Sequence, residues 1–441
     1  MTRRLSKNQV LFCKFAVSAL YTALVHAAYR DYINPTFEYA HYTYLPYTAV
    51  NLAITYMLSC IVILFHRESS HVCQSVAGLI YALCYVPIQL SLLFTVNKDF
   101  FQSVLPAQVA LALSMSMIFL VCRKGRPPNQ VSQVSFKSTD VLMNSITWFS
   151  IALILVTSQN HLRFVSFEDV YDLRSISASQ QVDNPFLSYL VSWTSYSFIS
   201  YCFARALVYK KLSFLITSIL GCLIIYMSSG SKATLLLLPM TYFLTLAWKD
   251  GKNFLLRFLS YLTISIFTIL YLIPDKGALI WVKSLSLLRI VGNSGWSASK
   301  YFEYFQDNGY TFFTHIPFVN SIFGGYPYKQ YSLGQVIGLE YSGSTEANFN
   351  ASFWASDGFA AIGVLGILLV TVPLIVLLYT INCTTYVFDS KFTVAWLSGF
   401  FVALLNVPLT TACFSGGGLI ILLISWRVSK KCRRIACSEE V

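Results

Sequence analysis

Long hydrophobic runs recur along nearly the whole chain and are separated by shorter polar connections. Each run is about 20 residues long, which is enough for a helix to cross the hydrocarbon core of a bilayer. Counting these runs predicts about twelve membrane-spanning helices. We expect the helices at residues 10–29, 46–65, 73–95, 104–122, 141–158, 185–208, 212–228, 232–248, 255–273, 358–380, 393–411 and 413–426. The first run lacks a clear cleavage site, so we interpret it as a retained helix rather than a signal peptide.

The connections between the runs are of two alternating kinds. One kind is short and basic, as in the opening MTRRLSKNQ, the stretch CRKGR at 122–126 and the tail KKCRR at 430–434. Membrane proteins keep such connections in the cytoplasm. With an even number of crossings, both termini are then cytoplasmic. The pattern predicts an all-α polytopic membrane protein in which residues 1–441 form a single integral membrane domain.

Two connections on the outer side are much longer than the others, and they cover residues 159–184 and 274–350. Long connections in compact proteins are usually functional. We expect both loops to face the periplasm, and we expect the second one to contain short helices. A functional site is therefore predicted on the outer side.

Composition and charge exclude several classes of function. The net charge of +12 could suggest nucleic-acid binding, but the basic residues lie in the membrane linkers. The cysteines lie in predicted spans or at cytoplasmic ends, so no disulfide framework is expected. Neither a metal-ligand cluster nor a nucleotide-binding motif is present, so we expect no metal and no other cofactor. Charged residues are scarce within the spans, which argues against a proton-coupled carrier.

Basic residues in the outer connections need a reason, because the positive-inside rule disfavours them there. Arg163 and Arg174 lie in the loop 159–184, where nearby acidic residues could simply pair with them. Lys232 begins a predicted span after a Gly-Ser turn, an arrangement that suits the binding of an anion. The alternative is an interfacial lysine whose side chain extends to the membrane surface. Arg289 lies in the apolar run LSLLRIV, and its guanidinium suits phosphate oxygens.

The end of the second loop reads STEANFNASFWASDGFAAIGVLGI over residues 344–367 and combines amides, rings and carboxylates. Aromatic faces with amide and hydroxyl partners suit sugar rings, although an interfacial aromatic belt would look similar. Asp357 could take up a proton, or it could merely cap a helix that begins at Gly358. The candidate residues in and near this segment are His315, Tyr341, Glu346, Asn348, Asn350, Trp354 and Asp357.

The order of several segments resembles the Wzy-type O-antigen polymerases, which join oligosaccharide repeat units in bacterial envelopes. Four segments carry the resemblance, and LTTACFSGGGLIILL at 409–423 adds weaker support. The four are VYDLR at 170–174, SGSKATLLLLP at 229–239, LLRIVGNSGWSASKYFEYF at 287–305 and NFNASFWASDGFAAIGVLG at 348–366.

The resemblance implies a metal-independent glycosyltransferase of the bacterial inner membrane. It would transfer a growing glycan from undecaprenyl pyrophosphate to a lipid-linked repeat unit, beside a flippase and a chain-length regulator in the same bilayer. Many members of the family have arginine where this chain has Lys232. The roles that the resemblance implies are pyrophosphate binding by Arg163, Arg174, Lys232 and Arg289, glycan binding by Tyr341, Asn348, Asn350 and Trp354, and proton transfer by Asp357, with Glu346 and His315 as alternatives.

Three other functions remain open. The enzymes that ligate O-antigen to the lipid A core share this general plan, but they carry a histidine in the polar segment that precedes the glycine-spaced span. This chain has no histidine between 344 and 367. A lipid-linked oligosaccharide flippase or another transporter would be expected to carry cations within its spans and to have smaller outer loops. A membrane scaffold without catalysis would leave the outer arginines unexplained.

Overall fold

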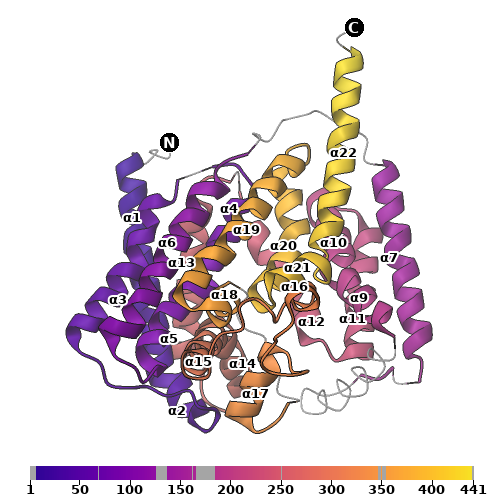
Figure 1. The fold of residues 1–441 in the computed structure, drawn as a ribbon. Helices are drawn as coiled ribbons and strands as arrows, with labels where there is room; N and C mark the ends of the chain where they lie inside the picture. The colour runs from indigo at the N-terminus through magenta and orange to yellow at the C-terminus, as the bar shows by residue number, and fades with distance from the viewer. Residues whose placement is uncertain are drawn as a thin grey trace.

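The computed structural model describes residues 6–67, 69–125, 137–160, 162–164, 184–249, 251–345, 349 and 354–439. Every regular element in these ranges is helical (Figure 1). The prediction of an all-α chain is therefore confirmed for the described residues.

The helices differ widely in length, and short π- and 3-10-helical turns join several of them into longer runs. The first half of the chain contains α1 (Lys7–Ala28), α2 (Asn34–Phe37), α3 (Ala49–Ile61), α4 (Cys73–Ile80), α5 (Val86–Thr95), α6 (Leu105–Cys122), α7 (Lys137–Ser158), α9 (Pro185–Trp193), α10 (Ile199–Tyr209), α11 (Leu212–Ser229) and α12 (Lys232–Ala247). The second half contains α13 (Phe254–Phe267), α14 (Ala278–Leu287), α15 (Asn293–Asn308), α16 (Pro317–Phe323), α17 (Leu333–Ser342), α18 (Ala355–Ile362), α19 (Val364–Thr385), α20 (Ser390–Asn406), α21 (Leu409–Phe414) and α22 (Gly418–Glu439).

Several helical runs have the length and composition of membrane spans. Among the described residues there are seven: Asn8–Ala40, Cys73–Thr95, Phe100–Cys122, Lys137–Ser158, Leu212–Ser229, Phe254–Leu272 and Val364–Thr385. Three further apolar helices are shorter: Ala49–Phe65, Ala233–Ala247 and Ser390–Asn406. The helices therefore fit a helical membrane protein, whereas the number of twelve crossings remains a prediction.

One face of the helix α19 is both apolar and exposed, which is unfavourable in water. Leu365, Leu369, Val372, Val376 and Tyr379 recur at helical spacing along one face, and each is between 47% and 66% exposed. A continuous apolar stripe of this kind would be costly in water, and it is expected on a helix that faces lipid.

The connections predicted to be cytoplasmic meet at one end of the bundle, which we call the inner end. The Asn382 amide of α19 donates to the carbonyl oxygens of Cys122 and Lys124, at 2.9 Å each, and its oxygen accepts from the Cys73 N–H at 3.2 Å. The same side of the bundle holds the start of α1 and the end of α22 (Figure 1). The end of α19 thus joins the ends of α6 and α4.

The connections predicted to be periplasmic meet at the opposite end, the outer end. Lys98 Nζ lies 2.6 Å from Asp307 Oδ1, and Trp296 Nε1 donates to the His41 carbonyl oxygen at 2.9 Å. These contacts join the connection between α2 and α3 and the connection after α5 to α15. The predicted alternation of the connections between two ends is visible in these contacts.

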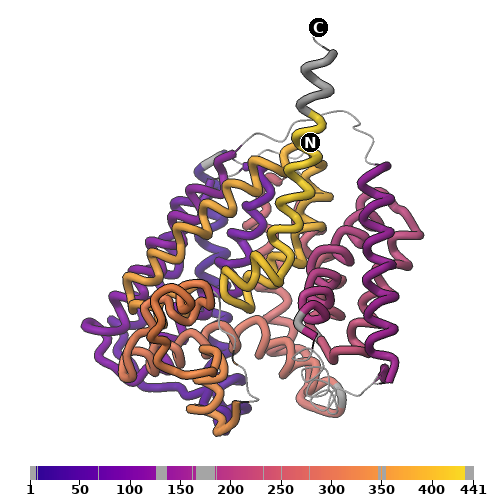
Figure 2. Tube along the Cα trace, turned by 45° about the vertical axis from the view of Figure 1, so that its right-hand side comes forward, coloured from indigo at the N-terminus to yellow at the C-terminus, as the bar shows by residue number. Residues whose placement is uncertain are grey.

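The segment 274–350 contains four helices, α14 to α17, as expected for a loop with short helices. Figure 2 shows α15 to α17, in orange, at the end of the bundle away from the start of α1. Gly295 lets α15 approach α5 closely, because a Cβ at this position would lie 2.1 Å from Ser91 Oγ. The outer segment is therefore packed onto the bundle.

Three predicted spans have clearly different boundaries in the structure, and one of them, predicted at 393–411, is α20 followed by a break before α21. The span predicted at 358–380 is divided at Gly363, whose φ of 69° with ψ of −145° is a conformation open to glycine but not to residues with a Cβ. The short helix α18 ends there, and the long helix α19 begins. The last span was predicted at 413–426, whereas α22 runs from Gly418 to Glu439 and extends beyond the bundle (Figure 1).

Candidate functional site

Two of the residues predicted to carry proton transfer lie in direct contact. His315 Nε2 is 2.7 Å from Asp357 Oδ1, although the residues are 42 positions apart in the chain. Their side chains are only 6% and 5% exposed, respectively. A buried imidazole–carboxylate pair excludes most of the water that would compete for its proton, so it is a strong candidate for acid–base chemistry.

Asp357 is positioned by the short helix α18. This helix begins at Ala355, so Asp357 lies in its first turn, and no side chain caps the helix at Trp354. The alternative that Asp357 caps a helix starting at Gly358 is therefore wrong, because its carboxylate faces His315 instead.

Close packing of α18 on α19 fixes the position of this turn. A Cβ at Gly358 would lie 2.4 Å from the Gly366 carbonyl oxygen, and a Cβ at Gly366 would lie 1.8 Å from the Gly358 carbonyl oxygen. Neither position can hold a larger residue without separating the two helices. The glycine spacing in the sequence was expected to allow such packing, as small residues do between membrane helices.

His315 is positioned by a loop that is bonded to the end of α18. The Thr311 N–H donates to the Ala360 carbonyl oxygen and the Phe312 N–H donates to the Ala361 carbonyl oxygen, at 2.8 Å each. The last carbonyl groups of a helix lack partners within the helix. The loop satisfies two of them and brings His315 to the helix that carries Asp357.

The same loop contains two strained residues. Phe312 and Phe313 have φ angles of 49° and 64°, in the left-handed region that bulky residues rarely adopt. Such residues cost on the order of 1–3 kcal/mol each, and they occur mainly where function requires the conformation. The strain directly precedes His315, which adds weight to the pair as a functional site.

Tyr301 of α15 is a buried tyrosine near Asp357. It is 2% exposed, and its hydroxyl donates to the Phe349 carbonyl oxygen at 3.2 Å. Burial and then the nearby Asp357 charge raise the pKa of Tyr301 well above its ordinary value. Tyr301 therefore stays neutral at physiological pH and keeps the proton that it donates to Phe349.

Two of the four lysines in the outer segment 274–350 are already paired. Lys300 Nζ lies 2.9 Å from Glu303 Oε2, and the buried Lys283 Nζ lies 3.0 Å from Asp275 Oδ1. These contacts reduce the positive charge that either lysine could offer to a phosphate.

Arg289 is the exposed cation of this segment that lies between α14 and α15. With the Asn293 amide oriented to satisfy its neighbours, the amide oxygen accepts from Arg289 Nη1 at 3.1 Å. Arg289 also lies near Tyr42. Burial raises the pKa of the Tyr42 hydroxyl, and the positive charge of Arg289 acts in the opposite direction. Arg289 precedes Tyr301 by twelve helical positions, or roughly 18 Å along the axis, so it does not contact the pair directly.

The remaining predicted cations lie elsewhere or are only partly described. Arg163 is exposed, and its N–H donates to the Met227 carbonyl oxygen at 3.4 Å, which places it beside the turn that leads into α12. Lys232 is the first residue of α12, but its side chain lies outside the described part of the structure. Arg174 also lies outside the described residues.

The residues predicted to bind glycan are not all available for it. Trp354 is fully buried, and its Nε1 donates to Thr371 Oγ1 at 2.7 Å. Its ring packs inside the bundle and has no exposed face, so the structure does not support stacking on a sugar. Tyr341 is half-buried, with Lys300 Nζ 4.9 Å from its ring centre. Glu346, Asn348 and Asn350 lie outside the described residues.

The structure adds two residues that the sequence analysis did not single out, Thr311 and Tyr301. Thr311 Oγ1 lies 2.8 Å from His315 Nδ1. In the sequence, the only sign of this contact is that Thr311 precedes His315 by four positions. A spacing of four is too common to indicate a site by itself. Tyr301 was one of many tyrosines in the loop.

A separate buried polar cluster lies near the inner end. Asp140 Oδ1 accepts from Arg205 Nε at 2.5 Å and from the Tyr201 hydroxyl at 2.7 Å, and its Oδ2 accepts from Lys211 Nζ at 3.0 Å. The carboxylate is thus well satisfied. The cluster ties α7 to α10 and to the start of α11, and we interpret it as structural.

Comparison with protein-family models, with curated proteins and with solved structures found no match for this chain.

Proposed function

We propose that the chain is a membrane glycosyltransferase that polymerises undecaprenyl-pyrophosphate-linked oligosaccharide repeat units on the outer face of the bacterial inner membrane. The observation that carries the proposal is the buried pair formed by His315 and Asp357. It joins the large outer segment to the glycine-spaced helices, and these two regions contain two of the four segments that carry the resemblance to the polymerases.

The proposed chemistry needs a proton acceptor near the acceptor sugar. The hydroxyl oxygen of one repeat unit attacks the anomeric carbon of the glycan carried by the other lipid. The bond from that carbon to the pyrophosphate oxygen breaks, and its electron pair leaves with undecaprenyl pyrophosphate. Asp357 takes the hydroxyl proton, a step that contributes about 100- to 10,000-fold when a side chain is well positioned for it.

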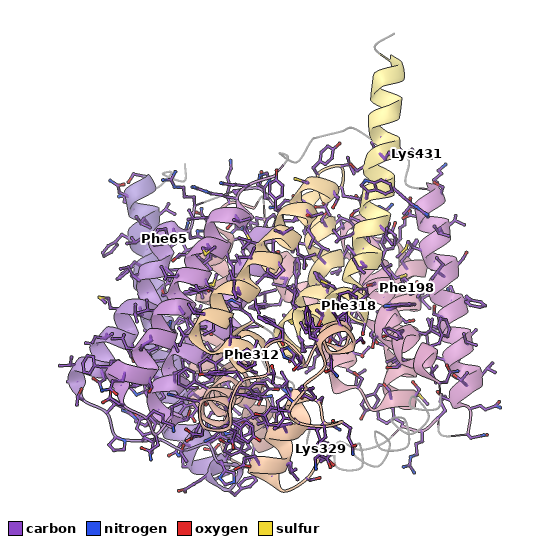
Figure 3. All side chains as sticks on the ribbon, viewed as in Figure 1. Phe65, Phe198, Phe312, Phe318, Lys329 and Lys431 are labelled. Atoms are coloured by element: carbon purple, nitrogen blue, oxygen red, sulfur yellow. The ribbon has the colours of Figure 1, made fainter. Side chains whose placement is uncertain are left out.

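The surroundings of the pair suit a substrate with a long apolar chain. Phe312, Phe318, Ile322 and Phe323, all within eleven positions of one another, are between 58% and 79% exposed. Figure 3 labels Phe312 and Phe318 on the two sides of His315 in the sequence. Exposed apolar groups this close in the chain to a buried acid–base pair suit contact with the apolar chain of a polyprenyl lipid.

Charge stabilisation of the leaving pyrophosphate is assigned to the outer cations. Arg289 can bind phosphate oxygens in a bidentate way, and Arg163, Arg174 and Lys232 are the further candidates. The proposal includes about twelve crossings, cytoplasmic termini, and a flippase and a chain-length regulator as partners in the same membrane.

The O-antigen ligase reaction is the second candidate, and one observation favours it. The segment 344–367 has no histidine of its own, yet His315 reaches its Asp357 from the preceding loop. The ligases use a histidine in the corresponding segment, so the structure weakens the argument that separated the two reactions. The two candidates differ in the acceptor and can be distinguished in cells.

Deletion of the gene in the native bacterium, followed by gel display of its lipopolysaccharide, tests the proposal. A polymerase deletion leaves the core with a single repeat unit, whereas a ligase deletion leaves the bare core and lets lipid-linked polymer accumulate. Complementation with the intact gene should restore the ladder. A deletion strain with a ladder of normal length and intensity would exclude both reactions.

A further inference from the structure

The Thr311 hydroxyl has two hydrogen-bond partners. Its oxygen lies 2.8 Å from His315 Nδ1 and 3.1 Å from the Ala360 carbonyl oxygen. A hydroxyl has one proton to donate and can accept as well. If it donates to Ala360, it can accept a proton from Nδ1–H. If it turns and donates to Nδ1, that nitrogen carries no proton.

The other imidazole nitrogen always has a proton between itself and the carboxylate. His315 Nε2 and Asp357 Oδ1 are 2.7 Å apart, and two bare acceptors would repel at that distance. With this proton on Nε2, the imidazole has two satisfied states. In one, both nitrogens carry protons and Thr311 accepts. In the other, only Nε2 carries a proton and Thr311 donates.

The carbonyl group of Ala360 does not depend on the hydroxyl. It also accepts from the Thr311 N–H at 2.8 Å, so it keeps a partner when the hydroxyl turns toward His315. The backbone bond already attaches the loop to α18. The hydroxyl is therefore free to follow the imidazole, and a purely bracing role would not need it.

We infer that Thr311 is a positioning residue of the proposed site, whose hydroxyl can either accept from or donate to Nδ1 and so holds the His315 ring against Asp357. The role in glycosyl transfer rests on the proposed function, whereas the hydrogen bond itself does not. Among the described residues, the charged group in contact with the imidazole is Asp357 of α18, and the neutral Tyr301 of α15 lies near that carboxylate.

The inference also assigns the roles of the pair. Both nitrogens of His315 are occupied by Thr311 and Asp357, so the imidazole has no free nitrogen for a substrate hydroxyl. Asp357 Oδ2 has no hydrogen-bond partner among the described residues. The substrate proton is therefore taken by Asp357 Oδ2, and His315 holds the carboxylate in place through Nε2.

The test compares three substitutions in the purified, full-length protein. Thr311→Val keeps the shape and removes the hydroxyl, and Thr311→Ser keeps the hydroxyl. Thr314→Val is the matched control, because the Thr314 hydroxyl bonds to the Thr311 carbonyl oxygen and not to His315. Thermal unfolding in detergent shows which variants are folded, and Thr311→Ala replaces the valine variant if that one fails.

The first measurement is the nitrogen NMR spectrum of protein labelled with 15N only in its histidines, of which the chain has six. A His315→Gln variant identifies the His315 signals by their loss. The Nδ1 signal should move to the position of a nitrogen without a hydrogen bond in Thr311→Val, and it should keep the wild-type position in Thr311→Ser and Thr314→Val. An unchanged Nδ1 signal in Thr311→Val would overturn the inference.

The second measurement is transfer activity on lipid-linked repeat units. Thr311→Val should lower kcat roughly tenfold or more, the size expected when a hydrogen bond to a charged group is lost, with KM nearly unchanged. Thr311→Ser should restore kcat. A valine variant with wild-type kcat, or a serine variant as impaired as valine, overturns the role in transfer. If the wild-type protein itself transfers no glycan, the proposed function fails, while the NMR result still decides the hydrogen bond.

Discussion

Asp357 and His315 form a site because each is held by a different backbone segment. The carboxylate is placed by the first turn of α18, and the imidazole by a strained loop bonded to the other end of that helix. Neither side chain is free to turn toward solvent, since both are almost completely buried. At the scale of single residues, the proposed function therefore depends on a few atoms.

Replacing Asp357 with Asn should abolish polymer formation while the protein still inserts and folds. The asparagine oxygen can still accept from His315 Nε2, but the side chain cannot take a proton at neutral pH. We expect transfer to fall about 100- to 10,000-fold, measured as the lipopolysaccharide ladder and as kcat in vitro. Asp307→Asn is the control, since Asp307 is an exposed carboxylate of the same outer segment. A normal ladder from Asp357→Asn would remove this residue from the chemistry.

Arg289→Ala should reduce polymerisation with little effect on protein level. Losing one charge-stabilising donor removes about 2–4 kcal/mol from the transition state, a factor of roughly 30 to 1000. Arg289→Lys should also be impaired, because lysine lacks the planar fork. Lys276→Ala, at another exposed cation of the outer segment, should leave the ladder unchanged. Equal ladders from Arg289→Ala and Lys276→Ala would make Arg289 an ordinary surface residue.

At the scale of elements, the contact between α18 and α19 decides whether the site exists. The helices approach through Gly358 and Gly366, and the chain reverses between them at Gly363, which has positive φ. This arrangement gives a short helix that carries the carboxylate and a long helix with a lipid-facing stripe. A single straight span could not have placed Asp357 beside the loop at 311–315.

Gly366→Ala should destabilise this contact and displace the pair. The new Cβ would lie 1.8 Å from the Gly358 carbonyl oxygen, a distance that only movement of the helices can relieve. Overpacking of this kind costs about 1–3 kcal/mol. We expect a lower unfolding temperature in detergent and reduced transfer. Leu369→Ala, on the exposed face of the same helix, should change both quantities little. Equal stability of the two variants would contradict the tight contact.

At the scale of the whole molecule, the two ends of the bundle have different compositions. The inner end gathers the short basic connections, and the outer end gathers the helices of the segment 274–350 (Figure 2). The candidate pair belongs to this outer segment and to the helices directly behind it. The proposed reaction therefore requires that the outer end face the periplasm.

Reporter fusions test that orientation. A fusion at Gly325, in the outer segment, should behave as exported, and a fusion at Gly125, after α6, should behave as cytoplasmic. Alkaline phosphatase and a fluorescent reporter that matures only in the cytoplasm give opposite signals at each position, so each serves as the control for the other. The reverse pattern would place the pair in the cytoplasm and exclude the proposed reaction.

The sequence by itself determined the helical class, the approximate position of most apolar helices and the grouping of their connections at two ends. These properties depend on local composition: a long apolar run must satisfy its backbone hydrogen bonds internally, and basic residues mark one side. Single residues with suitable chemistry, such as Asp357 and His315, could be named for the same reason. Their partnership could not be seen, because 42 residues of chain separate them.

Only the tertiary structure decided which of the candidates meet. The break at Gly363, the left-handed Phe312 and Phe313 and the backbone bonds to the end of α18 are set by packing, and no local pattern predicts them. Packing also buried Trp354 against Thr371. The ring is therefore not available for the sugar stacking that its residue type had suggested. Residue type determines what a side chain can do, whereas the neighbours that the fold brings to it determine whether it can do so.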